Sequence, residues 1–411
     1  MSHKFKSFLI FIIFFLFFPF NAKGAEWSLT PGIDVYSIYN SNILFTSKDK
    51  KEDYQLFLDP KFSVSGDYEV TKLKGDFLFN IKKYFKHSEF DVVNFNNGIT
   101  INHWFSPKFS LSLSGNFKKD DILRTELERA GIVGVRKKRY IYGFDIYGSY
   151  AFSDRFNVGI SGGESFKNYP EGPYPDFGQW YLGINPSYNL TVKDNIGLAF
   201  NYYDTDFEDT GRIKLTTGYI YWKRDINENT NFTLGFGGRY TKTEYIRTTL
   251  KIYVNPQFPY ILYLVPIREK ITEEKTGLIF NFSINHNWTE KFLSSVDIIK
   301  EYYTTVDARG IDHTYLRTRS GYKLTQKLAI GVNLSYDRND YESQKYLPKE
   351  KVDYVRINPY TTYKISKNLS ISGNFSYEYS KDKIETREYI KNRVKFFILL
   401  RYNYNKLFST Y

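Results

Sequence analysis

The chain has 411 residues, a net charge of +12 and no cysteine, so disulfides, thiolate metal sites and a cysteine nucleophile are excluded. Aromatic residues make up 19% of it, with 38 Tyr and 36 Phe, although its mean hydropathy is only −0.47. Few soluble domains combine these properties, whereas a membrane β-barrel needs aromatic girdles around a polar interior.

The N-terminal 24 residues are predicted to form a secretory signal peptide. Lys4 and Lys6 give a basic start, and Ser7–Phe20 is an apolar run too short to span a bilayer comfortably. Ala22-Lys23-Gly24 offers small residues for cleavage, so we expect residues 25–411 to form one exported domain. We expect most of the basic charge to be solvated loop and lumen surface. Where it meets a partner, an exported protein is expected to contact outer-membrane lipid, lipopolysaccharide phosphates or anionic glycans rather than nucleic acid.

Alternating segments follow along the whole exported chain. In Phe109–Lys119, Leu369–Ser380 and Val394–Tyr404, apolar or aromatic positions alternate with mostly polar ones. A two-residue period with one apolar and one polar face is typical of a strand with lipid on one side and water on the other. The pattern therefore predicts an all-β, up-and-down antiparallel barrel in the outer membrane.

The connections between these segments are of two kinds, which alternate. Short turns share the motif aromatic, any residue, apolar, Ser or Thr, any residue, basic residue or Asn, apolar. Its copies are His103–Phe109, Tyr150–Phe156, His286–Phe292, Tyr322–Leu328 and Tyr363–Leu369, with looser copies at Tyr188–Ile196 and Tyr221–Phe232 and a further turn near Asp67–Thr71. The longer polar connections lie near 46–53, 86–89, 120–134, 167–177, 204–211, 247–274, 304–312, 339–351 and 381–386. Eight short and nine long connections predict about eighteen strands, within a range of about 16 to 20, with short periplasmic turns and longer extracellular loops.

Two local features carry further predictions. The longest connection, Arg247–Glu274, is unusually apolar and predicts a β-hairpin, which could extend two strands above the membrane, fold into the mouth or dock a partner. We favour the strand extension. The triplets Leu58-Asp59-Pro60, Ile184-Asn185-Pro186 and Ile357-Asn358-Pro359 place a proline inside a strand, where it cannot donate to the ladder, and so predict a bulge or bend.

Catalytic chemistry has little support in the sequence. The five His have no metal-ligand spacing, and no nucleophile elbow, phosphate loop or zinc motif occurs. We therefore expect no enzymatic activity, no cofactor and no metal. Alternation predicts a set of charged residues facing the lumen, in which basic residues outnumber acids and favour anions, unless the charges pair with one another. These candidate pore-lining residues are Lys74, Asp76, Lys82, Arg139, Asp145, Lys214, Arg239, Glu378, Lys395 and Arg401.

The start of the exported chain carries a recognisable pattern. Leu29-Thr30-Pro31-Gly32-Ile33 leads into Tyr39–Phe45 and then to Leu58-Asp59-Pro60. This pattern resembles the beta-barrel porin 2 family and the related exosortase-system-associated outer-membrane barrels, although Ser41 stands where those proteins have an acidic residue. The resemblance implies a barrel of similar length with a link to exopolysaccharide production and export.

Three functions are compatible with these observations. The first is a porin-like channel for exopolysaccharide or anionic solutes, with polysaccharide export components as partners. The second is a barrel that its own loops plug and that anchors a surface or secretion assembly. The third is the sleeve of a porin–cytochrome electron conduit, in which the haem protein must be a separate chain because this one lacks cysteine. In each case the barrel assembly machinery would insert the protein, and the aromatic Tyr411 suits that recognition.

Overall fold

The computed structural model describes residues 26–121, 138–170, 174–208, 210–254, 262–305, 309–342, 350–384 and 387–404. The predicted signal peptide and Tyr411 lie outside these ranges. Within them the chain is almost entirely β-structure, with one short 3-10 helix, η1 (Ser88–Phe90). None of the described residues belongs to a helix long and apolar enough to cross a membrane.

Eighteen strands follow one another along the chain. They are β1 (Glu26–Asn40), β2 (Asp53–Asp67), β3 (Thr71–Tyr84), β4 (Val92–Ser106), β5 (Phe109–Asp121), β6 (Lys138–Ala151), β7 (Phe156–Asn168), β8 (Phe177–Asn189), β9 (Asp194–Phe207), β10 (Gly211–Asn227), β11 (Thr230–Val254), β12 (Leu262–Asn287), β13 (Phe292–Thr304), β14 (Gly310–Lys323), β15 (Leu328–Tyr341), β16 (Glu350–Lys364), β17 (Leu369–Ile384) and β18 (Arg387–Asn403).

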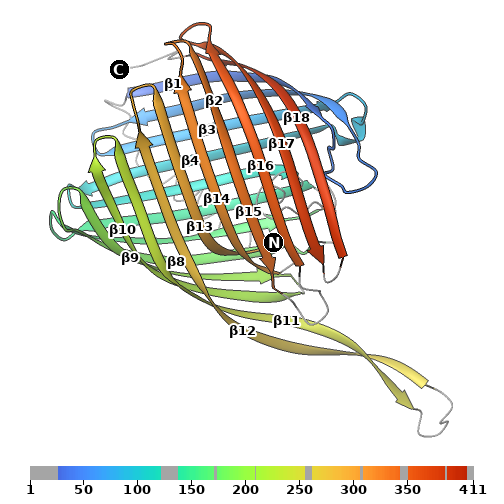
Figure 1. Ribbon diagram of the computed structural model, residues 1–411. Coiled ribbons are helices and arrows are strands. Elements are labelled where there is room, and N and C mark those ends of the chain that lie inside the picture. The colour runs from blue at the N-terminus through green and yellow to red at the C-terminus, as the bar shows by residue number, and fades with distance from the viewer. Residues whose placement is uncertain are drawn as a thin grey trace.

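Each strand pairs antiparallel with its neighbours in sequence, and β1 pairs with β18, so the sheet closes into a barrel (Figure 1). The closing ladder runs from Gly32 opposite Asn403 to Asn40 opposite Lys395. Because the barrel is closed, the main-chain donors and acceptors of the wall find partners within the sheet, as a lipid environment requires, except where the β12–β13 ladder ends at Phe280 and Lys300. The predicted up-and-down barrel of eighteen strands is therefore confirmed.

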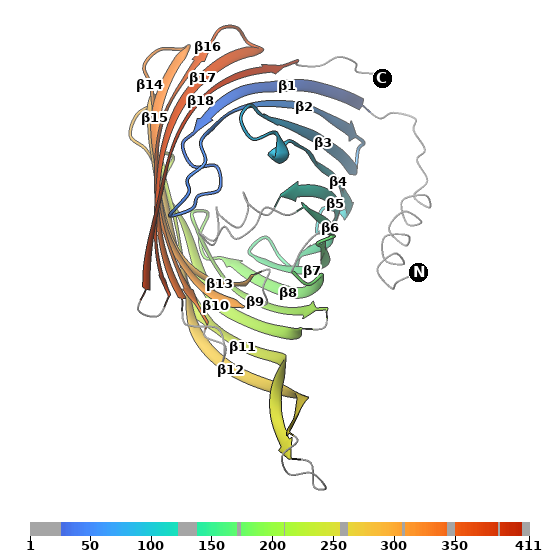
Figure 2. The same cartoon turned by 90° about the vertical axis from the view of Figure 1, so that its right-hand side faces the viewer.

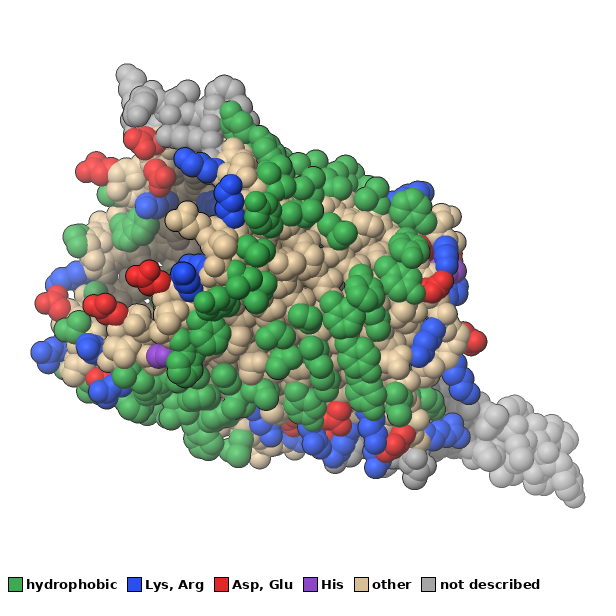
Figure 3. Space-filling view, turned by 45° about the horizontal axis from the view of Figure 1, so that its top comes forward, with side chains coloured by type: hydrophobic (Ala, Val, Ile, Leu, Met, Phe, Trp, Pro, Cys, Tyr) green, Lys and Arg blue, Asp and Glu red, His purple; other side chains and the backbone are tan. Residues whose placement is uncertain are grey.

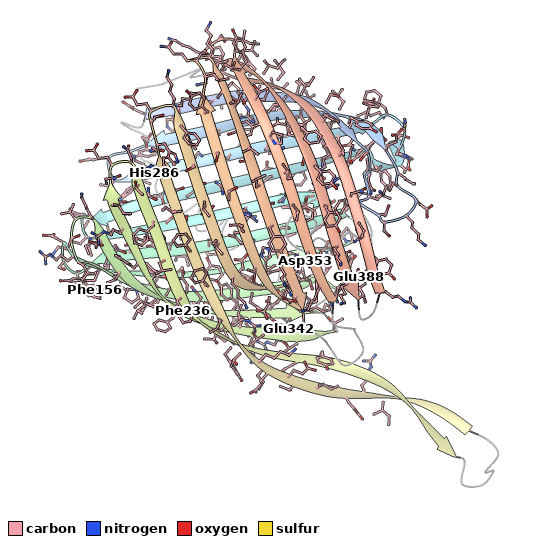
Figure 4. The ribbon with its side chains drawn as sticks, in the orientation of Figure 1. Phe156, Phe236, His286, Glu342, Asp353 and Glu388 are labelled. Carbon is pink, nitrogen blue, oxygen red and sulfur yellow. The ribbon has the colours of Figure 1, made fainter. Side chains whose placement is uncertain are left out.

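Six of the eight short turns are closed by the Ser or Thr of the sequence motif. In the turn between β4 and β5, the Ser106 hydroxyl accepts hydrogen bonds from the backbone N–H groups of Lys108 (3.2 Å) and Phe109 (3.1 Å). The same pair of bonds recurs at Ser153, Thr191, Thr289, Thr325 and Ser366. A side-chain acceptor at this position replaces a backbone partner in the tight reversal, which explains why the residue recurs. Figure 4 shows His286 and Phe156 near this short-turn rim and Asp353 and Glu388 at the opposite one.

The outer face of the wall is an apolar belt. Phe236, Leu182 and Ile398 are 55%, 56% and 60% exposed, and many other large apolar side chains share their face. Figure 3 shows hydrophobic side chains over the body of the barrel and charged side chains gathered toward its rims. So large an exposed apolar surface around a closed barrel requires lipid contact, which confirms the expected outer-membrane location.

The Asx-Pro triplets do not form the predicted bulges. In β16, Ile357 lies opposite Tyr377 and Tyr360 opposite Asn374, so the register continues unchanged past Pro359. Pro359 therefore lies opposite Phe375. Because proline has no backbone N–H, it cannot donate a hydrogen bond to the Phe375 carbonyl. The Asn358 side-chain amide donates to that carbonyl at 2.8 Å and takes the place of the missing backbone donor. The predicted bulge is therefore wrong, and at Pro359 the side chain of the preceding residue supplies the donor without an extra residue.

This repair can be measured as a coupling between the two residues. Asn358→Ala should lower the free energy of unfolding by about 1 kcal/mol, the usual net value of a buried hydrogen bond. In a Pro359→Ala background the loss should be smaller, because the substituted alanine would donate its own backbone N–H. Urea titration of the barrel refolded in lipid vesicles measures both effects. An equal loss in the two backgrounds would contradict the proposed replacement.

The long connection 247–274 is mostly strand. β11 continues to Val254 and β12 starts at Leu262, and the two pair with each other over this whole stretch. Figures 1 and 2 show the hairpin leaving the barrel and pointing away from its mouth. The favoured strand extension is therefore confirmed, and the alternative of a hairpin folded into the mouth is excluded.

Candidate functional site: the lumen

Most of the predicted lumen residues alternate with exposed apolar residues of the belt and so face inward. Lys82 alternates with Phe79 and Ile81, and Lys395 with Phe396 and Ile398. The structure places Lys74, Asp76, Lys82, Arg139, Asp145, Arg239, Glu378, Lys395 and Arg401 on this inner face.

Lys214 is the exception. Its neighbours in β10, Ile213 and Leu215, are buried and line an interior cavity, so Lys214 lies on the outer face. In the register it stands opposite Asp204 and Lys242. Beyond the apolar belt an outward lysine can reach the headgroup layer, so its charge gave no indication of which face it occupies.

A carboxylate held by two cations marks the inner face of β17 and β18. Glu378, which is 1% exposed, accepts from Arg393 Nε at 2.9 Å and from Lys395 Nζ at 2.6 Å. Since one acid meets two cations, the group has a net positive charge. Alternation predicted Glu378 and Lys395 as lumen residues, whereas Arg393 was missed, although it shares the parity of Lys395.

A second group of the same composition lies toward the other rim. Asp34 in β1 accepts from Lys61 Nζ of β2 at 2.9 Å and from Arg401 Nη2 of β18 at 3.1 Å. This group again combines one acid with two cations. We call the four cations of the two groups the basic column: Lys61, Arg393, Lys395 and Arg401.

Other predicted lumen charges also have partners, and Asp120 is shared between Arg139 and Lys118, whose Nζ lies 2.7 Å from its carboxylate. Lys74 Nζ lies 2.9 Å from the Asp76 carboxylate, and the buried Arg139 donates from Nε to Asp120 at 2.8 Å. Asp145 accepts from the Tyr181 hydroxyl at 2.8 Å. For Lys74, Asp76 and Arg139 the alternative interpretation, in which lumen charges pair with one another, describes the arrangement better than free pore charges.

The wall across from the basic column is rich in tyrosine and amides. In the closed order of strands, β9 lies halfway round the barrel from β18, and Figure 2 shows the two on opposite sides. Tyr181 of β8 and Tyr203 of β9 stack with ring centroids 5.8 Å apart. We call the inward tyrosines of this region the tyrosine wall: Tyr147, Tyr181, Tyr203, Tyr219 and Tyr221.

The connection between β1 and β2, residues 41–52, folds into the barrel, and we call it the inward loop (Figure 2). At its tip Phe45 has a φ of 51° and is fully buried. Its ring meets Tyr354 edge to face at 6.0 Å and lies 4.7 Å from the Arg393 guanidinium. The loop therefore covers the end of the basic column that contains Arg393. The sequence predicted a polar external loop here and gave no sign of this packing.

Hydrogen bonds fix both ends of the inward loop. The amide of the buried Asn42 donates to the carbonyls of Thr46 at 2.8 Å and Asn392 at 3.1 Å. At the other end, a hydrogen bond from Lys86, with a second from Tyr39, holds the pKa of the exposed Glu52 carboxyl below its usual value. Glu52 is thus ionised over the whole neutral range, so the ion pair persists there.

No group of three or more His, Asp or Glu side chains among the described residues could hold a metal ion. What the lumen offers instead is a choice of surfaces: cations in excess on one wall and aromatic rings with amides on the other. Such an arrangement can bind and orient a passing solute without changing it.

Comparisons with known proteins give the fold alone. No protein-family model matches the sequence, and no curated protein matches it. Among solved structures, the outer membrane protein opdK from Pseudomonas aeruginosa is similar over 92% of this chain and 99% of its own, with 9% identity and a TM-score of 0.47. OccAB3 from Acinetobacter baumannii is similar over 93% and 100%, with 11% identity and a TM-score of 0.45. The siderophore receptor PirA from Acinetobacter baumannii is similar over 92% and 80%, with 9% identity and a TM-score of 0.48. We draw no functional argument from likenesses at this level.

The class of protein follows from the structure itself: a membrane-spanning, eighteen-stranded outer-membrane β-barrel with a charged, partly loop-covered lumen.

Proposed function

We propose that this barrel is a passive outer-membrane channel for anionic saccharides and related acidic solutes. The observation that carries the proposal is the pair of opposed walls. The basic column supplies excess positive charge, which attracts carboxylate, sulfate or phosphate groups. The tyrosine wall supplies flat rings that can stack on sugar faces, with hydroxyl and amide groups that can hydrogen-bond to sugar hydroxyls.

The proposal agrees with the export of exopolysaccharide that the resemblance to the beta-barrel porin 2 family implies. Polysaccharide export components would then supply the substrate at the periplasmic rim. We further propose that the chain has no enzymatic activity, since passage through such a lumen requires binding and release but no bond cleavage.

Flux into vesicles tests the proposal directly. Proteoliposomes carrying the refolded barrel should take up short oligomers of a uronic acid faster than neutral oligomers of the same length. Vesicles with no protein are the control for leakage. Equal uptake of acidic and neutral oligomers would contradict the proposal, because it would show that the channel does not select for anionic saccharides.

The inward loop supports one second candidate, a plugged barrel that serves as a docking platform. Phe45 and Asn42 are both fully buried by contacts inside the lumen, as a plug would require. A folded barrel that carries neither oligomer in the same vesicles would favour this candidate over the channel.

A further inference from the structure

The hydrogen-bonded wall is interrupted between β12 and β13. The two strands pair from Asn287 opposite Leu293 up to Phe280 opposite Lys300, and no further. Beyond that rung, β13 continues to Thr304 paired with β14 alone, and β12 continues to Leu262 paired with β11 alone. We call this break the seam.

A charged cluster spans the seam in place of main-chain hydrogen bonds. The guanidinium of Arg239, whose side chain is 2% exposed, donates to the Asp312 carboxylate from Nε at 3.1 Å and from Nη2 at 2.8 Å. It also lies 4.0 Å above the Tyr302 ring, and the Tyr302 hydroxyl donates to Glu342 at 3.1 Å. Figure 4 shows Glu342 where the ends of the later strands approach β11 and β12. Both sides of the seam are thereby held together through side chains.

The faces that meet at the seam are not the same. Arg239 is on the lumen parity of β11, whereas Tyr302 and Asp312 are on the outer parity of β13 and β14. The inner face of the β11–β12 hairpin therefore laps over the outer face of the neighbouring strands. Glycine provides the room: a Cβ on Gly310 would collide with the Tyr302 hydroxyl, and one on Gly277 would lie 2.8 Å from Arg239 Nε.

A cavity of about 450 Å³ leads from the lumen to this seam. Its lining is mixed: Phe177, Ile213 and Leu215 are unusually apolar for a barrel interior, whereas Gln179, Asn201 and Thr205 are polar. Its lining also includes Phe280 and Lys300, which stand on the outer parity at the last rung of the β12–β13 ladder. The cavity thus reaches side chains of both faces of the wall, and its volume is in the range of small-molecule sites.

The seam also lies at a particular height. Its last rung, at Lys300, is close to the edge of the apolar belt. One step earlier on the outer face of β13 is Ile298, which lies opposite Leu316 of β14, one of the last exposed apolar residues there. At this level lipid headgroups meet acyl chains. A cavity that offers both apolar and polar side chains, and that has Lys300 in its lining, suits at this height a molecule with a chain and an acidic head.

We propose that the seam is a side port that binds an amphiphile with one acyl chain and an anionic headgroup. The chain would lie among Phe177, Ile213 and Leu215, and the headgroup would pair with Lys300. The cavity shares Tyr203 and Tyr219 with the tyrosine wall, but the inference concerns binding at the seam and does not depend on the selectivity of the channel. The same chemistry could come from a free fatty acid in the lumen or from an anionic lipid of the surrounding bilayer.

Photo-crosslinking tests the site and distinguishes the two sources. The full barrel in lipid nanodiscs is irradiated with a fatty acid that carries a diazirine on its chain, or with phosphatidylglycerol that carries the same chain, and the modified residues are located by mass spectrometry. We expect modification at the cavity residues of β10, β12 and β13. Modification by the free acid alone identifies a free fatty acid as the ligand, and modification by phosphatidylglycerol identifies an anionic lipid of the bilayer.

Variants that fill the cavity provide the decisive comparison. Leu215→Trp on β10 and Ile279→Trp on β12 should each reduce cavity modification about fivefold or more, because the larger side chain fills the volume that the ligand would occupy. Leu198→Trp, which faces lipid on β9, is the matched control and should change nothing. Modification spread over the outer belt, no modification by either probe, or cavity modification unchanged in both filling variants would overturn the proposal.

Discussion

Replacing residues 44–50 of the inward loop by a two-residue Asn-Gly turn should raise the single-channel conductance of the barrel about twofold or more. The loop can be shortened there because the Ile43 N–H donates to the Lys51 carbonyl at 2.8 Å, so the two sides of its base already lie together. Removing the tip takes Phe45 away from Tyr354 and Arg393 and opens the Arg393 end of the basic column to solvent.

Two single substitutions refine this test. Phe45→Ala keeps the loop but removes its aromatic anchor, and should give frequent transitions between a low and a high conductance. Lys48→Ala, at an exposed position of the same loop, is the matched control and should behave as the wild type. Planar-bilayer recordings measure all three. If the shortened loop left the conductance unchanged, the loop would not restrict the passage.

Neutralising the basic column should lower the preference for anions about twofold or more, measured as the ratio of Cl⁻ to K⁺ permeability. Lys395→Gln and Arg401→Gln together remove two positive charges from the lumen. Each leaves one cation with its carboxylate, since Arg393 remains beside Glu378 and Lys61 beside Asp34. The acids are therefore not left buried without a partner, and the barrel should still fold.

The matched control for this change is Lys214→Gln. It removes the same kind of charge from the outer face of β10, beyond the lumen. We expect no change in permeability ratio there. A shift as large as that of the double variant would mean that Lys214 reaches the conduction path and that the basic column is not the source of selectivity.

Local patterns in the sequence were enough to predict the architecture. Ser106 and its counterparts recur because each closes a tight turn through its hydroxyl, so the turn positions could be found without a structure. Alternation then located the strands between the turns, and closure follows from the need to leave no edge in lipid. The hairpin around Arg247–Glu274 was predictable for the same reason, since its alternation continues that of the strands below it.

The candidate site was less predictable because it depends on contacts between distant segments. Phe45 looks like any apolar loop residue, and its burial requires Tyr354 and Arg393, which lie far along the chain near its other end. The grouping of two cations around Glu378 or Asp34 depends on the register between strands. The seam is a further example, since nothing local to Phe280 or Lys300 indicates that their ladder ends there.

The two wrong predictions have physical causes of their own. The alternation of apolar and polar residues identifies the outer face of a strand only where that face contacts lipid. Lys214 lies beyond the apolar belt, so the alternation did not show that it faces outward. The proline rule assumes that a missing N–H must distort the ladder, whereas the amide of Asn358 supplies a donor from the side chain.

The most direct test of the proposed channel is the reversal potential of the wild-type barrel in a planar bilayer under a KCl gradient. An open, anion-preferring channel is predicted, because the basic column leaves the lumen with cations in excess of their carboxylate partners. A properly folded barrel that prefers cations, or that passes no current at all, would contradict this account.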